Sequence, residues 1–170
     1  MKITAQEEYG LRCLLAVARH ATPDTPLSIS EIARMEALST QYVAKLMNIL
    51  KRQKLVESTR GLCGGFRLAR SAASISVSDA LHALGGGFEI GNQQICNHFT
   101  GQKENCVHVK DCSMRPMWQT IIRHISEFFH NLSLQQLLDS EQQASMRMDD
   151  SIHQIAETHP APRPVPRAGG

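Results

Sequence analysis

Two short amphipathic stretches separated by very few residues constrain the fold of this chain more than any other feature. The stretches EIARMEAL (31–38) and QYVAKLMNILKRQ (41–53) both carry apolar side chains at helical spacing. The candidate N-cap residues are Ser28 or Ser30 for the first helix and Ser39 or Thr40 for the second. Two helices joined by so short a turn predict a helix-turn-helix, in which the second helix turns one face to the core and another to solvent.

A hairpin with three glycines in its turn follows the second helix. The segments LVEST (55–59) and FRLA (66–69) favour β-structure, and the turn between them contains Gly61, Gly64 and Gly65. A hairpin placed directly after a helix-turn-helix is the wing of a winged helix-turn-helix.

A long apolar seam occupies the segment after residue 112. Apolar side chains alternate spacings of four and three from Met114 to Leu132, as in a coiled coil. Ser113 is the predicted N-cap, and Pro116 is tolerated because it falls in the first turn. An exposed helix with so apolar a stripe needs a partner, and we favour a second copy of the chain over burial within one chain. The predicted dimer-interface residues are Trp118, Ile121, Ile125, Phe128 and Leu132.

These segments predict a mainly α chain with a small β-hairpin. Apolar side chains at helical spacing in residues 5–20 add a first helix, and a short capped helix is expected at 76–84. The predicted units are a winged helix-turn-helix domain with a two-stranded wing (1–84), a cysteine-rich loop (85–112), a long dimerisation helix with a short helix (113–140) and a tail (141–170). Four of the seven prolines lie in that tail, so we expect it to be disordered or extended.

Charge is spread unevenly along the chain. Residues 1–70 carry eleven Lys and Arg against six Asp and Glu, whereas residues 71–170 carry seven against ten. The basic half is a candidate for binding a polyanion, although an ordinary fluctuation of surface charge gives the same pattern. No apolar run approaches the roughly eighteen residues of a membrane span, and the N-terminus has acids where a signal peptide has an apolar core. We therefore expect no membrane partner and a cytoplasmic location.

Three of the five cysteines fall in the stretch CNHFTGQKENCVHVKDC (96–112), with nine and then five residues between neighbours. In a reducing compartment they are thiols or metal ligands rather than structural disulfides. Thiolates suit an iron–sulfur cluster, three cysteines and a histidine can hold zinc, and Cys106 with Cys112 can form a redox-switched disulfide. The intervals are long for zinc, whose paired ligands usually have two to four residues between them. A cysteine hydrolase is disfavoured because no partner site is recognisable.

The segments together resemble the Rrf-two family of bacterial transcription regulators, which includes the IscR and NsrR types. The matching motifs are MKITAQEEYGLRCLL, SISEIARMEALSTQYVAKLMNILKRQKLVES, the wing TRGLCGGFRL and the cysteine pair before SMRPMW. The resemblance runs from Met1 to about Leu138. It implies a homodimeric, DNA-binding transcription regulator, expected to be a repressor and not an enzyme. Its operator affinity would be controlled by an iron–sulfur cluster that senses redox state, nitric oxide or iron.

The resemblance also implies a ligand set for a two-iron or four-iron cluster. The implied metal ligands are Cys96, Cys106, Cys112 and Glu8. Glu8 would come from the first helix of the other subunit, and His98 or His108 are substitutes for that fourth position. Glu8 can alternatively pair with Arg12 four residues on, as a common surface ion pair.

Three positions depart from the family pattern. Cys63 stands where the wing usually has a third glycine, and we expect it to be a tolerated small residue rather than a second redox site. The interval after Cys96 is longer than in the IscR-like pattern, which weakens Cys96 as a ligand more than the other two thiols. Arg115 stands where IscR-type sequences carry a histidine, so that ligand is missing.

The polar face of the second helix supplies the predicted contacts with double-stranded DNA. The residues expected to read base edges in the major groove are Gln41, Tyr42, Lys45 and Asn48. The expected phosphate-binding and wing residues are Ser39, Thr40, Arg60, Gly64, Gly65 and Arg67. A dimer predicts a pseudo-palindromic operator, and Tyr42 can instead pack between helices. The competing class is a protein-interaction module that binds a partner helix through the seam and does not bind DNA.

Overall fold

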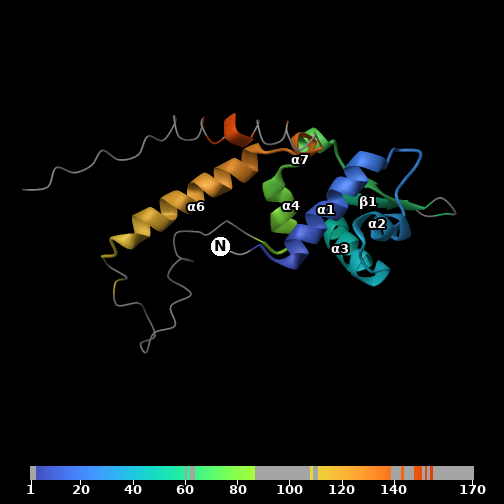
Figure 1. Cartoon of the computed structure of the whole chain (residues 1–170), viewed down its shortest axis with the longest axis horizontal. Coiled ribbons are helices and arrows are strands. Elements are labelled where there is room, and N and C mark those ends of the chain that lie inside the picture. The colour runs from blue at the N-terminus through green and yellow to red at the C-terminus, as the bar shows by residue number, and fades with distance from the viewer. Residues whose placement is uncertain are drawn as a thin grey trace, which may run out of the picture.

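The computed structural model describes residues 3–59, 61, 64–86, 108, 111–138, 143, 148–150, 152 and 154. The elements in these ranges are α1 (Ala5–His20), α2 (Ile29–Glu36), α3 (Thr40–Arg52), β1 (Val56–Thr59), β2 (Gly65–Leu68), the 3₁₀ helix η1 (Ala72–Ser74), α4 (Val77–Ala83), α6 (Met114–Asn131) and α7 (Leu134–Leu137). Figure 1 shows α1 to α4 and the hairpin gathered into one unit, with α6 extending away from it. None of the helices in the described ranges is long and apolar enough to cross a membrane. The predicted fold class, mainly α with a two-stranded wing, is confirmed.

Serine side chains set where the helices of the helix-turn-helix begin. The Ser28 hydroxyl accepts a hydrogen bond from the Glu31 amide at 3.3 Å, while the Glu31 carboxylate accepts one from the Ser28 amide at 2.9 Å. Ser39 caps α3 because its hydroxyl accepts from the Tyr42 amide at 3.2 Å. These bonds satisfy amides that a helix leaves free in its first turn. Of the candidate caps, the structure therefore selects Ser28 and Ser39.

One apolar face of α3 is completely buried. Its residues with no exposed surface are Val43, Leu46, Met47 and Leu50. They belong to one core cluster with buried residues of the two preceding helices, which include Leu14 and Val17 of α1 and Ile32 of α2. Burial of this face removes much apolar surface from water, so the opposite face of α3 is held toward solvent.

The wing is an antiparallel hairpin with a third segment paired to the other edge of β2. β1 and β2 pair with Val56 opposite Leu68. Leu27, in the loop before α2, adds two hydrogen bonds: its amide donates to the Phe66 carbonyl at 2.9 Å, and its carbonyl accepts from the Phe66 amide at 2.8 Å. This bridge ties the wing to the helix-turn-helix, so the wing keeps a fixed position relative to α3.

Backbone hydrogen bonds join the C-terminal end of α6 to the winged domain. The Val77 amide donates to the Leu132 carbonyl at 2.8 Å, and the Leu134 amide donates to the Ile75 carbonyl at 2.7 Å. Leu134, in α7, has no exposed surface and belongs to the main core. A second apolar cluster at this joint contains Val77, Leu81 and Leu132, with Phe128, Phe129 and Leu137 packed against it. The end of α6 is therefore fixed on the domain that carries α3.

Two features of the second half of the chain add to what the sequence predicted. Ser113 precedes α6, but its side chain makes no capping hydrogen bond, because its backbone is already helical (φ −62°, ψ −22°) and not extended as at most caps. Within the tail from residue 141, which stays predicted as disordered or extended, the described residues 148–150 are helical and Met148 packs against the cluster at Leu132. The prolines that suggested disorder begin only at Pro160, beyond these helical residues.

Candidate functional site

Polar and basic side chains form a continuous stripe along the solvent face of α3. The exposed residues of this stripe are Gln41, Lys45, Asn48 and Arg52. Spacings of four, three and four residues keep them on one side of an α-helix, opposite the buried face. α3 carries no acidic residue, so nothing on the helix itself offsets the positive charge of the stripe. A surface of this composition suits a polyanion that also offers hydrogen-bond donors and acceptors.

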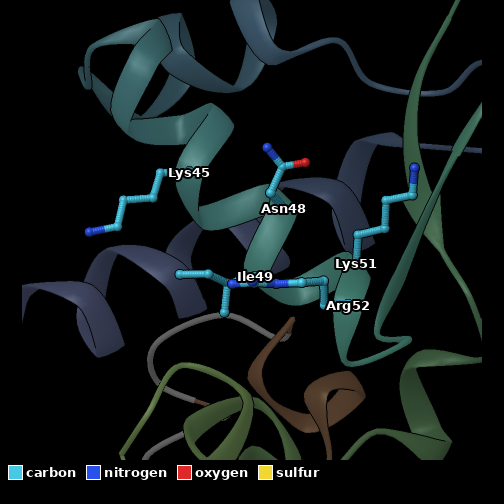
Figure 2. A pocket seen from close by; sticks show the side chains of 5 residues that line it. All are labelled: Lys45, Asn48, Ile49, Lys51 and Arg52. Carbon is cyan, nitrogen blue, oxygen red and sulfur yellow. The ribbon is translucent and has the colours of Figure 1, made fainter.

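The C-terminal half of α3 borders an open depression of about 590 Å³. Its lining residues are Lys45, Asn48, Ile49, Lys51 and Arg52. Figure 2 shows Lys45 and Lys51 extending to opposite sides of the helix, with Asn48 between them. The Lys51 Nζ donates to the Ser58 Oγ of β1 at 2.5 Å, which connects the end of α3 with the wing. The DNA-binding residues predicted from the sequence do not include Lys51 and Arg52. Their position in the last turn of a basic helix could have pointed to them.

The N-terminal end of α3 exposes Ser39 and Thr40. The first amides of a helix carry partial positive charge and favour an anion such as phosphate at this position. The Ser39 hydroxyl already accepts from the Tyr42 amide. Capping does not exclude a phosphate contact, because a hydroxyl that accepts one hydrogen bond can still donate its own hydrogen.

Close backbone approach requires glycine at two positions of the wing. A Cβ at Gly65 would lie 2.6 Å from the Leu27 carbonyl oxygen, and one at Gly64 would lie 2.7 Å from the Thr59 carbonyl oxygen. Backbone atoms cannot yield as a flexible side chain can, so any larger residue would displace the strands. Gly64 and Gly65 therefore shape the wing, whatever the wing contacts.

Arg67 is held at the base of the wing. Its Nε donates to the Glu57 carboxylate at 2.6 Å across the hairpin, and its Nη1 donates to the Pro23 carbonyl at 3.3 Å. Both ion-pair partners are well exposed, so the pair contributes little to stability. Arg60, the other predicted cation of the wing, lies outside the described residues.

Glu8 and Arg12, the possible surface pair on α1, do not pair with each other. The Arg12 Nε donates to the Glu36 carboxylate of α2 at 2.8 Å. This hydrogen bond and the charge of Glu36 raise the pKa of Arg12, with a smaller contribution from the charge of Glu8. Glu8 is exposed, and no ion pair of Glu8 is found in the part of the chain that the structure describes. Its carboxylate is therefore accessible to a partner outside this domain.

The neighbouring Glu7 has a structural role that the sequence pattern did not reveal. Glu7 is buried, and its carboxylate accepts a hydrogen bond from the Thr4 amide at 2.6 Å. A Cβ at Gly86 would collide with the Glu7 carboxylate, so a larger residue there would force this side chain to move. The Gln6 Nε2 also donates to the Leu84 carbonyl at 2.6 Å. The start of α1 is thereby fixed beside the end of the winged domain.

The two cysteines that the structure describes differ sharply in environment. Cys13 has no exposed surface, and burial raises the pKa of its thiol to about 11, whereas Cys112 is partly exposed just before α6. Arg115, at the position of the missing histidine, donates to the His108 carbonyl at 3.2 Å. Cys63, Cys96 and Cys106 lie outside the described residues. Cys13 is a core residue, whereas the Cys112 thiol is accessible. Within the described ranges, no three His, Cys, Asp or Glu side chains gather as a metal site.

The start of α6 and the start of α1 lie far apart within one chain. Figure 1 shows the N-terminal end of α6 (yellow) at the end of the helix that points away from α1. Cys112 directly precedes this end of α6, whereas Glu8 lies in the first turn of α1. A site that uses both residues therefore has to draw them from different chains.

Within the part of the chain that the structure describes, the apolar seam of α6 packs on the winged domain at its C-terminal end. Phe128 and Leu132 pack in the cluster with Val77 and Leu81 of the same chain. The large apolar side chains that stay exposed toward the N-terminal end are Met114, Met117, Trp118 and Ile121, with exposed fractions of 40–56%. Such a row of exposed apolar side chains marks an interaction surface.

Comparison with known proteins agrees with this architecture. Residues 3–140 match the Rrf2 family, which is described as an iron-dependent transcriptional regulator. The chain belongs to the Rrf2 (Rrf-two) family. It is therefore a DNA-binding transcription regulator. The prediction that the chain is a regulator rather than an enzyme is confirmed.

Individual relatives support the same assignment. The chain is 39% identical over 84 residues to the Protein rrf2 of Nitratidesulfovibrio vulgaris, a match that spans 49% of this chain and 55% of that one. It is 27% identical over 141 residues to the HTH-type transcriptional regulator IscR of Yersinia pseudotuberculosis, covering 83% and 81%. Among solved structures, T. potens IscR superposes with a TM-score of 0.60 at 25% identity, covering 81% and 86%. CymR, the global cysteine regulator of B. subtilis, shares the fold with a TM-score of 0.66 at 24% identity, covering 81% and 96%.

We expect the Cys13 thiol to resist iodoacetamide at about pH 8 in folded, metal-free protein, and Cys112 to react under the same conditions. A pKa raised to about 11 leaves almost no Cys13 thiolate at that pH, and the core excludes the reagent. Peptide mass mapping after quenching measures both thiols, and urea-unfolded protein is the control in which both should react. Equal labelling of Cys13 and Cys112 in the folded protein would contradict the core assignment.

Proposed function

We propose that this regulator binds a pseudo-palindromic DNA operator as a homodimer, with an affinity controlled by an iron–sulfur cluster. One observation carries the DNA-binding part: the basic, acid-free stripe of α3 opposite a completely buried face. The fixed position of the wing relative to α3 supports a binding surface that includes both. A repressor acts by this kind of operator occupancy.

The stripe and the surfaces beside it divide into base-reading and phosphate-binding groups. Gln41, Lys45 and Asn48 carry amide and ammonium groups that suit adenine and guanine edges in the major groove. Lys51 and Arg52 join the phosphate-binding set, because they line the depression beside the stripe at the end nearest the wing. The other phosphate-binding and wing residues proposed are Ser39, Thr40, Arg60, Gly64, Gly65 and Arg67.

The uncovered half of the seam is proposed to bind the same helix of a second chain. Trp118 and Ile121 are exposed, and Ile125 continues their row toward the joint. Phe128 and Leu132 extend the interface where it meets the cluster of the chain's own winged domain. An exposed apolar row of this length in a helix is stabilised by a second copy, as in a coiled coil. The pairing would fix the distance between two α3 helices and hence the spacing of the half-sites.

The proposed cluster is held by Cys96, Cys106 and Cys112 of one chain and Glu8 of the other. Accessible Cys112 and exposed Glu8 fit this donor set, whereas buried Cys13 does not. A cluster held by these residues would supply a centre that reacts with oxidants or nitric oxide. The wide separation of α1 from the start of α6 supports a site shared between subunits. Release of Glu8 would then free α1, and with it the domain that carries α3, to change position.

We expect Lys51→Ala and Arg52→Ala each to weaken binding to all duplexes about equally, and to lower the slope of log affinity against log salt by about one. Each substitution removes one phosphate contact and the counterion release that accompanies it. Fluorescence anisotropy with a labelled duplex at several salt concentrations measures the slope. Arg123→Ala, which removes a charge from the exposed surface of α6, is the matched control and should leave the slope unchanged. Unchanged slopes in all three variants would contradict the phosphate role, and absence of any duplex binding at low salt would favour the protein-interaction module.

Subunit complementation tests the shared cluster. Glu8→Ala and Cys112→Ala homodimers should each lose visible absorption when purified without oxygen. In a heterodimer of the two variants, one of the two sites regains both native ligands only if Glu8 acts across the subunits. We therefore expect the heterodimer, isolated through two different tags, to recover part of the absorption that both homodimers lack. A heterodimer of two differently tagged Cys112→Ala chains is the colourless control, and a Glu8→Ala/Cys112→Ala heterodimer that stays equally colourless would contradict a shared site.

A further inference from the structure

The first turn of α3 touches α1 through two aromatic rings. Tyr42, the third residue of α3, is half-buried, and its ring meets the Tyr9 ring of α1 edge-on. The ring centroids are 6.2 Å apart and the ring planes are inclined by 79°. This geometry places the positive edge of one ring against the negative face of the other, which is an attractive arrangement.

Arg12 extends this contact to α2. It lies one turn beyond Tyr9 on α1, and its guanidinium carbon is 5.6 Å from the centroid of the Tyr9 ring. The Arg12 Nε donates to the Glu36 carboxylate at 2.8 Å, and Glu36 is the last residue of α2. Tyr42, Tyr9, Arg12 and Glu36 thus form a chain of contacts across α3, α1 and α2. We call these four residues the tyrosine–arginine cluster.

The tyrosine–arginine cluster lies where a small movement of α3 would most affect its proposed contacts with DNA bases. Tyr42 follows Gln41 directly and lies at the border between the buried face of α3 and its exposed stripe. A helix whose inner face is uniformly apolar can turn slightly about its axis without exposing that face. A ring held at the border resists such a turn, because its contact with Tyr9 is lost when the helix rotates.

We propose that Tyr9 and Arg12 are positioning residues for DNA recognition. They hold Tyr42, and through it the orientation of Gln41, although they lie on a helix outside the DNA-reading stripe. Arg12 keeps the Tyr9 ring in place through the cation–π contact, and Glu36 keeps Arg12 in place through the ion pair. This inference rests on the proposed function of α3 as the base-reading helix.

The test compares sequence-selective with non-selective DNA binding. The probes are a duplex that the wild-type protein selects from a random-sequence library and a shuffled duplex of the same composition, both titrated by fluorescence anisotropy. Tyr9→Leu removes the ring, and we expect it to weaken binding of the selected duplex about three- to tenfold. Binding of the shuffled duplex should stay unchanged, because phosphate contacts do not depend on the orientation of Gln41. Tyr9→Phe keeps the ring and should behave like the wild type.

A double-mutant cycle separates positioning from general stability. If Tyr9 acts through Tyr42, the double variant Tyr9→Leu/Tyr42→Leu should have the same affinity ratio between the selected and shuffled duplexes as Tyr42→Leu alone. Leu11→Ala, on the same helix and also partly buried, is the matched control: it should lower the melting temperature without lowering selectivity. Arg12→Gln changes a half-exposed position and should also lower the selectivity for the selected duplex. This variant replaces Tyr9→Leu in the test if Tyr9→Leu does not fold.

The outcomes distinguish this inference from the function on which it rests. Equal losses on the selected and shuffled duplexes, or independent effects of Tyr9 and Tyr42, would overturn the positioning role. Wild-type binding of the selected duplex by Tyr9→Leu would overturn it too, while leaving the proposed function intact. If the wild-type protein selects no duplex from the library, the proposed function itself fails.

Discussion

Burial of one face of α3 is the constraint on which the rest of the structure depends. The side chains of this face, Val43, Leu46, Met47 and Leu50, are withdrawn completely from water, so the helix keeps this face against the core formed with α1 and α2. The basic stripe faces outward as a consequence of that burial. The side of α3 that faces solvent is therefore determined by core packing, and in the proposed function the same buried face turns the basic stripe toward DNA.

A second constraint connects this domain to α6. The hydrogen bonds of Val77 and Leu134, together with fully buried Leu134, fix the end of α6 on the winged domain. The other end of α6 extends away and carries exposed apolar side chains beside Cys112. A change at that free end moves a rigid helix whose base is attached close to α3. In the proposed function, this arrangement would connect the cluster ligands near the start of α6 to the domain that carries α3.

Local pattern was enough to predict the helices, the wing and the stripe. Helical spacing predicted residues 5–20 as the first helix, and α1 has these bounds, because amphipathic periodicity and capping are short-range properties. Long-range contacts were not predictable in this way. The burial of Glu7 has no signal in the local pattern, because it depends on Gly86, which only the fold brings next to it. Arg12 has an acid four residues before it, yet it pairs with Glu36, which the turn between helices brings closer.

We propose that Cys112, which is accessible just before α6, holds an iron–sulfur cluster together with Cys96 and Cys106. Iron, sulfide and zinc analysis with a visible spectrum, on protein isolated without oxygen, tests it most directly. We expect brown protein with iron and acid-labile sulfide. Its visible band should disappear in Cys112→Ala but persist in Cys13→Ala, since Cys13 lies in the core. Colourless protein that retains zinc would contradict the claim and make the loop a structural site. Colourless, metal-free protein would contradict it in favour of a thiol switch.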